Sequence, residues 1–365
     1  MLFRNSSLAL LFGSVMGAST PAFAGPLYTI TALPTGTNPT GINSAGQIVG
    51  DIWLGGGLRR AFTWSAGSLL QFDTLGGNDG SGTAINDAGH ATGYASLADG
   101  SVHTFVTSGA AIVDAKVFAN ATSSSGRAIN NGGNVAGLYY GADGNVHAFL
   151  RSGGVDLDIG TLGGNFTSAG GINAAGHVVG FGALDDSSPW LAHAFMYDGV
   201  MHDLGTMAGA SLSEATAIND YDQVTGHGWV FGSEHAFLYQ TGLMTDLGTL
   251  GGRESYAYDI NNLGQVVGNS NDVTDFDAFA YLYSGGVMTN LNTLIDPTSG
   301  WTLYNATGIN DAGQVAAYGC RGDECGGVLL NLTPLPVPEP ASIALFGLGL
   351  GLLGWRRASA ACRRG

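Results

Sequence analysis

Short apolar runs recur along the chain, and turns rich in glycine separate each run from the next. The clearest run centres on Ala-Phe or a close variant, and its copies begin at residues 61, 103, 147, 193, 235 and 277. A seventh copy, at residues 327–330, is degenerate. The runs are apolar on both faces rather than alternating, which is typical of a strand in a small sheet that lies between two others.

A polar turn precedes each of these strands. The motif Ile-Asn-x-x-Gly recurs seven times, at Asn43, Asn86, Asn130, Asn173, Asn219, Asn261 and Asn310, with Asp222 in place of one glycine. A second glycine follows in most copies, at Gly50, Gly93, Gly137, Gly180, Gly226 and Gly268, with Ala317 in the last. Asparagine side chains bond the backbone just ahead of them and glycine adopts positive φ, so both residue types favour turns. Steps of 42 to 49 residues between the asparagines predict a repeat architecture.

Each unit reads as four short strands, and the two ends of the chain decide how the units are joined. Residues 28–34 look like the fourth strand of a unit, whereas the last unit has no clear fourth strand before Pro334. A ring closed by pairing the first and last strands explains this offset and leaves no bare edge. We therefore predict an all-β fold, a seven-bladed β-propeller of four-stranded repeats over residues 25–334. A β-solenoid or a six-bladed propeller is the alternative.

Charge narrows the choice of partners. The sequence has 28 acidic residues and only seven basic ones between residues 25 and 340, which leaves 21 net negative charges. Such a body repels phosphate backbones, so nucleic-acid binding is not expected. Solubility is the simple explanation of the acidity, and divalent cations or cationic partners are the other one.

Residues 1–24 read as a secretory signal peptide. Arg4 precedes an apolar stretch, and Ala22-Phe23-Ala24 matches an A-x-A cleavage site. The sequence therefore predicts export.

The C-terminus, residues 335–365, combines Pro338-Glu339-Pro340, an apolar span at residues 341–355, and Arg356-Arg357. As a helix this span rises about 22 Å, short of the roughly 30 Å hydrocarbon core, so we expect a transient membrane association; a permanent anchor is the alternative. The tail resembles the PEP-CTERM sorting signal. The resemblance implies processing by an exosortase in the inner membrane of a Gram-negative bacterium, and delivery to the cell surface or extracellular matrix.

The repeats themselves resemble the HAF repeat, through the His-Ala-Phe at His147, His193 and His235. Arg60 and Asp277 replace that histidine in two copies, and Thr104 replaces the alanine in another. The resemblance implies an extracellular repeat protein and names no activity. The histidines occur once per unit without a second ligand at metal spacing, so we assign them to packing and strand-to-strand hydrogen bonds.

Cys320 and Cys325 bracket one short loop, and in an oxidising compartment we expect them to form a disulfide. Two cysteines without a second pair do not make a zinc site, and no cofactor is predicted apart from the calcium considered for the acidic loops.

Two longer loops depart from the repeat and carry clustered carboxylates. The first contains Asp185, Asp186 and Trp190, and the second contains Asp272, Asp275 and Asp277. Carboxylates suit calcium, although neither loop has the D-x-[DN]-x-[DN]-G pattern, and solvated loop acids are the alternative. Trp190, Trp229 and Trp301 are candidates for stacking on sugar rings, and packing between blades is the alternative.

The function we expect is a non-enzymatic surface module that binds or organises exopolysaccharide or another surface partner. The sequence has no G-x-S-x-G, H-E-x-x-H or phosphate-loop motif. A carbohydrate-active enzyme using Asp185, Asp186, Asp272 or Asp275 is one alternative, and a purely structural matrix protein is another.

Overall fold

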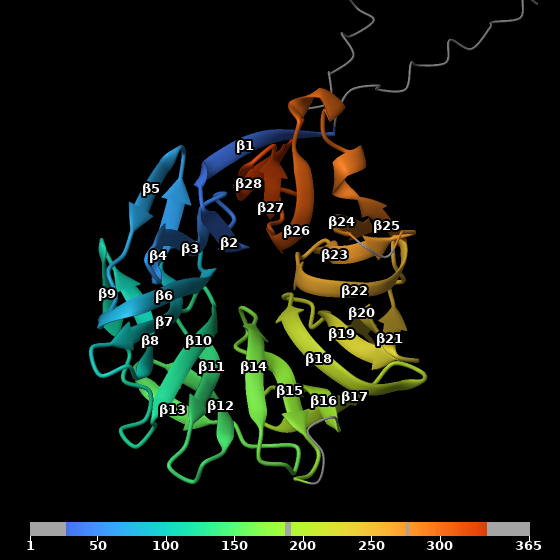
Figure 1. Ribbon diagram of the computed structural model, residues 1–365. Helices are drawn as coiled ribbons and strands as arrows, with labels where there is room; N and C mark the ends of the chain where they lie inside the picture. The colour runs from blue at the N-terminus through green and yellow to red at the C-terminus, as the bar shows by residue number, and fades with distance from the viewer. Residues whose placement is uncertain (1–26, 187–190, 275–276, 334–365) are drawn as a thin grey trace, which may run out of the picture. The chain divides into compact units, whose positions relative to one another are not determined.

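The computed structural model describes residues 27–186, 191–274 and 277–333. In these ranges the chain forms 28 β-strands and two short 3-10 helices, Leu291–Thr293 and Pro297–Ser299. The strands make seven four-stranded antiparallel sheets around a central axis (Figure 1). This architecture is a seven-bladed β-propeller, which confirms the predicted fold and excludes the solenoid and the six-bladed ring. Pro26–Thr333 forms one compact unit.

Each blade places one strand at each of four positions, from the axis outward, and we number the blades 1 to 7 in the chain order of their innermost strands. The innermost strands are β2 (Thr37–Ile42), β6 (Gly76–Ile85), β10 (Ser123–Ile129), β14 (Thr167–Ile172), β18 (Ala210–Ile218), β22 (Gly251–Ile260) and β26 (Thr302–Ile309). The second strands are β3 (Ile48–Gly55), β7 (Ala91–Leu97), β11 (Val135–Tyr140), β15 (Val178–Ala183), β19 (Val224–Val230), β23 (Val266–Asp272) and β27 (Val315–Arg321). The third strands are β4 (Leu58–Ser65), β8 (Val102–Ser108), β12 (Val146–Ser152), β16 (Ala192–Tyr197), β20 (Ser233–Gln240), β24 (Ala278–Ser284) and β28 (Glu324–Leu332). The outermost strands are β5 (Ser68–Gln71), β9 (Ala111–Asp114), β13 (Val155–Asp158), β17 (Met201–Gly205), β21 (Leu243–Asp246), β25 (Val287–Asn290) and β1 (Tyr28–Thr35).

The ring closes through its first strand. β1 pairs antiparallel with β28, from Tyr28 opposite Leu332 to Ala32 opposite Val328, and so completes the last blade. The Thr333 amide also donates to the Leu27 carbonyl at 2.8 Å, which brings the two ends of the propeller together. The predicted closure by the N-terminal strand is therefore confirmed, and the edge of β28 is covered.

The core lies between neighbouring blades. In five blades a fully buried phenylalanine of the third strand fills this space: Phe62, Phe105, Phe149, Phe195 and Phe237. Each of these lies opposite the second glycine of its repeat.

In blade 6 the residue opposite the second glycine, Gly268, is Tyr281. The counterpart of His-Ala-Phe there is Phe279-Ala280-Tyr281, so the sequence alignment on Asp277-Ala278-Phe279 was wrong by two residues. A second Ala-aromatic pair follows the first in this blade, and it is the buried Tyr281 that occupies the core position.

The second glycine is required by a close backbone approach and not by positive φ. A Cβ atom at these positions would lie 1.8 to 2.1 Å from a carbonyl oxygen of the innermost strand; the glycines are Gly50, Gly93, Gly137, Gly180, Gly226 and Gly268. The seventh blade carries Ala317 instead, and its innermost strand has an additional register shift between Leu303 and Asn305. The blade that tolerates alanine is thus the blade whose strand pairing is altered at that point.

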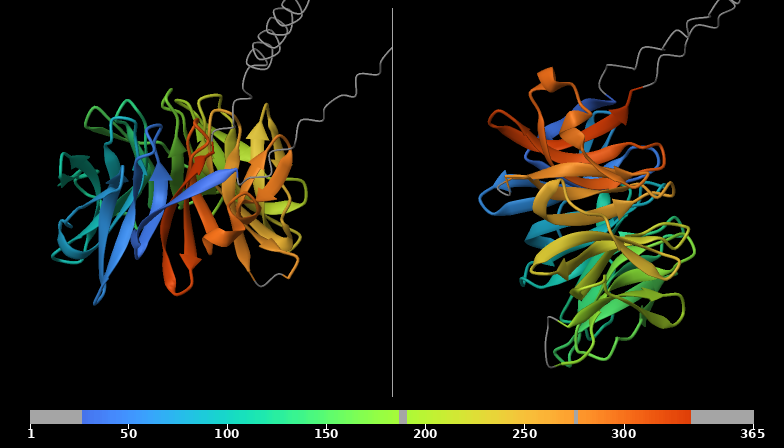
Figure 2. Two further views of the ribbon diagram at one scale, coloured as in Figure 1. Left: turned by 90° about the horizontal axis from the view of Figure 1, so that it is seen from above. Right: turned by 90° about the vertical axis from the view of Figure 1, so that its right-hand side faces the viewer.

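The propeller has two different faces, and Figure 2 shows the blades from the side. We call the face with the seven Ile-Asn-x-x-Gly turns the turn face. Because strands within a blade are antiparallel, the hairpins between second and third strands lie at the other end, which we call the hairpin face.

Candidate functional site

A central channel of about 790 Å³ is lined by residues of all seven innermost strands. Each innermost strand has a β-bulge at the third residue before its turn asparagine. Threonine occupies this position in four blades, and in three of these, at Thr40, Thr83 and Thr216, the hydroxyl donates to a carbonyl of the next blade at 2.8 to 3.0 Å. The other three blades place Arg127, Gly170 and Tyr258 there, so the channel wall is not sevenfold symmetric.

The seven turn asparagines form a closed ring of hydrogen bonds at the turn face. Each side-chain amide donates to the backbone carbonyl of the corresponding asparagine in the next blade, at 2.9 to 3.2 Å. Asn310 donates to Asn43, which completes the circle. The side-chain oxygens accept from their own turns, for example Asn130 Oδ1 from the Asn134 amide at 3.0 Å. The prediction of turn chemistry was right for the oxygen, but sequence reasoning missed what the amide does.

A partly buried carboxyl group lies in the channel wall of blade 6. Two residues before the turn asparagine, six blades have glycine or alanine, whereas blade 6 has Asp259. Its carboxylate accepts the Ile309 amide of the next blade at 2.8 Å and the Ile260 amide at 2.9 Å. Burial raises the pKa of Asp259 to about 7, against the effect of these two hydrogen bonds. Neighbouring chain encloses the carboxyl closely, and its remaining exposed surface opens onto the channel.

Aromatic side chains form one wall of the channel at blades 3 and 4. Phe166 and Phe181 pack with ring centroids 5.3 Å apart, and Tyr140, at the end of β11, is 47% exposed. Tyr140 ends a second strand, so this aromatic wall belongs to the hairpin face. Sequence reasoning did not single out these residues, because each falls in an ordinary strand or connection of the repeat.

A cluster of ionisable side chains lies between blades 5 and 6. Glu214 of β18 lines the channel, and its Oε2 is 3.7 Å from His227 Nε2 of β19. Burial, with the nearby charge of Glu234, raises the pKa of Glu214 to about 7. Burial lowers the pKa of His227 to about 4, so this histidine is neutral at pH 7. Sequence reasoning also missed these residues. An alignment of the seven repeats on their turn asparagines would have shown them.

The repeated histidines have the structural role that the sequence predicted. In four blades the histidine of the third strand pairs with an aspartate of the outermost strand, with Nδ1–carboxylate distances of 2.7 to 3.0 Å: His103–Asp114, His147–Asp158, His193–Asp203 and His235–Asp246. The pairs lie toward the outside of the blades and not around the channel.

The two acidic loops do not meet. The loop with Asp185 and Asp186 joins β15 to β16 in blade 4, and the loop with Asp272 and Asp277 joins β23 to β24 in blade 6, so blade 5 stands between them. Asp272 Oδ1 accepts the Thr274 amide at 2.8 Å and the Thr274 hydroxyl at 2.6 Å. Within the described ranges no group of three or more His, Cys, Asp or Glu side chains could hold a metal ion. Asp275 and Trp190 lie outside the described residues.

The remaining sequence candidates have separate environments. Trp301 is half-buried, and the Arg321 guanidinium lies over it, with its central carbon 5.4 Å from the centroid of the Trp301 ring. Trp229 is 42% exposed at the hairpin face. Of these two, Trp229 is the one open to a ligand.

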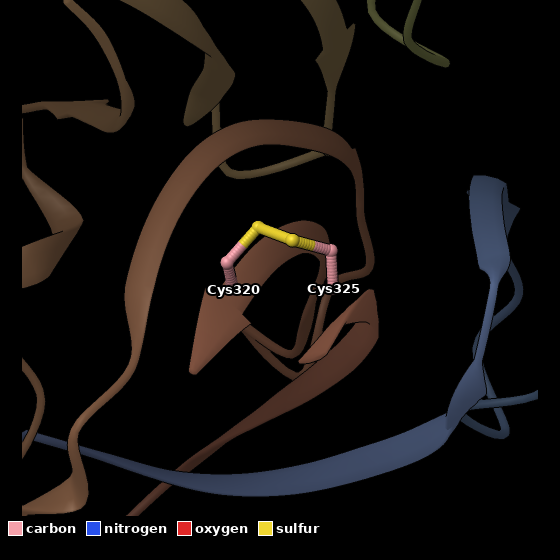
Figure 3. The surroundings of a disulfide bond; sticks show 2 residues. All are labelled: Cys320 and Cys325. Carbon is pink, nitrogen blue, oxygen red and sulfur yellow. A yellow bond between two sulfur atoms is a disulfide. The ribbon is translucent and has the colours of Figure 1, made fainter. Parts of the chain in front are cut away.

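Cys320 and Cys325 form the predicted disulfide, and they lie opposite each other on the paired strands β27 and β28 (Figure 3). The bond lies near the tip of the blade 7 hairpin, one residue pair before Arg321 and Glu324, which are the last paired residues of the two strands.

One known motif matches the chain. The PEP-CTERM protein-sorting motif matches residues 336–358, which include Pro338, Glu339, Pro340, Arg356 and Arg357. This motif supports export to the cell surface of a Gram-negative bacterium, with exosortase as the processing partner. Ala22, Ala24 and the apolar span 341–355 lie outside the described residues; in the part of the chain that the structure describes, no helix is long and apolar enough to cross a membrane.

Known structures share the propeller fold, while no curated protein matches the chain. The β-propeller domain of the Trilobed protease from Pyrococcus furiosus has a TM-score of 0.54 and 10% identity, over 82% of this chain and 94% of that one. A puromycin-hydrolyzing peptidase from Mycobacterium tuberculosis has a TM-score of 0.52 and 14% identity, over 83% of this chain and 55% of that one. At these identities the similarity shows the fold alone.

Proposed function

We propose that this chain is a surface-displayed, non-enzymatic binding module, and that it takes extracellular polysaccharide at the mouth of its central channel. The sorting motif supports a location where such a ligand occurs. The resemblance of the repeats to the HAF repeat agrees with that location. The choice of ligand rests on one structural observation, which is the aromatic wall of Tyr140, Phe166 and Phe181 in a channel that is also lined by polar side chains.

Sugar rings combine apolar faces with hydroxyl edges, and this wall offers partners for both. The aromatic rings provide flat apolar area, with Tyr140 half-exposed at the hairpin face. Arg127 of β10 and Glu214 of β18 also line the channel and can bond hydroxyl groups. Pockets that combine apolar surface with a few placed polar groups are the usual form of ligand sites.

The test is binding of Pro26–Thr333 to the host's own exopolysaccharide, measured by calorimetry. This segment contains every strand of the closed ring, so it can be studied without the terminal segments. Tyr140→Ala should weaken binding about tenfold, which corresponds to about 1.4 kcal/mol. Val155→Ala is the control, because Val155 is exposed on the outermost strand β13, away from the channel.

The other functions give different results in the same experiment. Shortened glycan after incubation would instead favour a carbohydrate-active enzyme, with Asp185, Asp186, Asp272 and Glu214 as the first residues to change. Neither binding nor cleavage would leave a structural matrix protein, and the polysaccharide proposal would then be dropped.

A further inference from the structure

The cluster between blades 5 and 6 can be compared with the equivalent residues between blades 1 and 2. Between blades 1 and 2, Arg59 of β4 makes a two-point ion pair with Asp79 of β6, with Nε–Oδ1 at 2.7 Å and Nη2–Oδ2 at 3.0 Å. The guanidinium also lies 5.4 Å from the centroid of the Trp53 ring and 5.5 Å from that of Tyr94. The guanidinium also donates to the Tyr94 hydroxyl, so a carboxylate and a hydroxyl accept its N–H groups while aromatic rings lie close to it.

The same positions exist between blades 5 and 6, with two differences: a glutamate stands in place of the arginine, and Asn269 stands in place of Tyr94, eight residues after the turn asparagine. Trp229 lies three residues after the second glycine, as Trp53 does, and Glu254 lies seven residues before the turn asparagine, as Asp79 does. The position of Arg59, three residues before the core phenylalanine, is taken by Glu234. The strand ladders agree with this alignment, because Trp53 lies opposite Arg59 and Trp229 lies opposite Glu234. The second location thus keeps the indole and the carboxylate and replaces the cation with a second carboxylate.

The resulting cluster is short of positive charge. Burial and the charge of Glu254 raise the pKa of Glu234, and Glu234 in turn acts on Glu214. The Oε2 of Glu234 and the Nδ1 of His227 are buried without a hydrogen-bond partner among the described residues. Tyr256 packs edge-on against His227, with ring centroids 5.1 Å apart. His235, which is next to Glu234 in the chain, pairs with Asp246 at 2.7 Å, and its charge partly offsets the rise in the pKa of Glu234.

We propose that Trp229, Glu234 and Glu254 form a binding site for a guanidinium group, supplied by an arginine side chain of a partner polypeptide. The incoming group would supply the positive charge that Arg59 supplies between blades 1 and 2. A guanidinium fits better than an ammonium, because its planar fork bonds carboxylates at two points while its face stacks on an indole.

The surroundings also suit a polypeptide. Trp229 is 42% exposed, and Phe231, at the tip of the same hairpin, is 90% exposed. Interfaces often combine an arginine with such exposed aromatic residues. The net negative charge of the body favours a basic partner as well. This site is separate from the aromatic wall at blades 3 and 4, so one proposal can fail while the other stands.

The first experiment builds the missing cation into the chain. Glu234→Arg in Pro26–Thr333 should raise the urea midpoint of unfolding, because it places an arginine beside Glu254 as Arg59 lies beside Asp79, and because it removes the repulsion between two carboxylates. Glu234→Gln should raise the midpoint less, since it only removes the repulsion. Arg59→Glu, the reverse change between blades 1 and 2, should lower the midpoint. If Glu234→Arg is less stable than Glu234→Gln, the location is not a guanidinium site and the proposal is wrong.

The second experiment measures the ligand directly. Three otherwise identical Gly/Ser peptides carry one arginine, one citrulline or one lysine next to a phenylalanine, and binding is followed by NMR titration. The arginine peptide should bind at least about tenfold more tightly than the uncharged citrulline peptide, and Glu234→Arg or Trp229→Ala should abolish the difference. Glu324→Gln, in the exposed blade 7 hairpin, should leave it unchanged. Equal binding of arginine and citrulline, or no binding of any peptide, would overturn the proposal. Preferential binding of glucosamine oligomers in the same assay would assign the site to a cationic sugar and overturn it too.

Discussion

Glu214 is a carboxyl group whose ionisation the fold disfavours, and this makes its contribution to stability depend on pH. Its folded pKa of about 7 lies above the usual value of 4.5, because the group is partly buried and Glu234 is nearby. A carboxyl with a raised folded pKa favours the folded state at low pH. That contribution is lost as the pH rises from the unfolded pKa through the folded one.

Glu214→Gln removes this dependence. The variant and the parent chain should differ little in free energy of unfolding near pH 4.5, and the variant should become more stable as the pH rises to 8. The gain should reach about 2 kcal/mol, after a discount for the part of the side chain that water screens. Urea unfolding at both pH values measures it. A gap of the same size at pH 4.5 and pH 8 would show that the change acts through packing and not through charge.

The turn asparagines show how far residue types can be interpreted from sequence. Ile-Asn-x-x-Gly is a local pattern, so the acceptor role of the side-chain oxygen follows from it. The donor role does not, because the partner carbonyl belongs to the next blade, for example Asn173 for Asn130. The same limit explains why Glu214 and Asp259 were missed, since their importance comes from side chains and backbone of neighbouring blades.

At the scale of the element, one strand offers a matched pair of glycines. In β15 a Cβ atom on Gly180 would lie 2.0 Å from the Ser168 carbonyl oxygen, whereas one on Gly182 would have no neighbour closer than 3.3 Å. Gly180→Ala should therefore destabilise the protein by about 3 kcal/mol or more, because strand pairing must shift to admit the methyl group. Gly182→Ala should cost less than about 1.5 kcal/mol. Thermal unfolding of the two variants tests this, and equal losses would mean that strand propensity, not the close approach, sets the requirement for glycine.

The positions of the strands were predicted well where the repeat motif is regular and poorly where its residues change. The Phe-centred strands of the first five blades lie where the apolar pattern placed them. Blade 6 differs, because Ala278-Phe279 and Ala280-Tyr281 are both Ala-aromatic pairs and only strand pairing with Gly268 distinguishes them. The acidic loops were visible as departures from the pattern, but sequence cannot show that they lie in blades 4 and 6 with another blade between them.

At the scale of the whole molecule, two sets of contacts join the first and last blades and so close the ring. One is the β1–β28 pairing, and the other is the asparagine ring that Asn310 and Asn43 complete. The first could be predicted because the strand count at the two ends left one strand missing. The proposed arginine site could not be predicted, because its three residues come from three strands of two blades. Their role becomes visible only when Trp229, Glu234 and Glu254 are compared with the equivalent residues Trp53, Arg59 and Asp79.

If closure depends on β1 as a strand and not on its position at the start of the chain, β1 should work equally well from the other end. A permuted chain that begins at Thr37 and runs from Thr333 through a short glycine turn into residues 27–35 makes blade 7 continuous, like the other six. The join is short, because the Thr333 amide already bonds the Leu27 carbonyl. The permuted chain should unfold in one cooperative transition close to that of Pro26–Thr333, since both keep the same strand pairs. A chain that simply lacks residues 27–35 should unfold at much lower urea, because β28 is left as a bare edge and buried core residues such as Tyr28 and Leu33 are lost. Equal stability of the deleted and permuted chains would mean that the asparagine ring closes the propeller without β1.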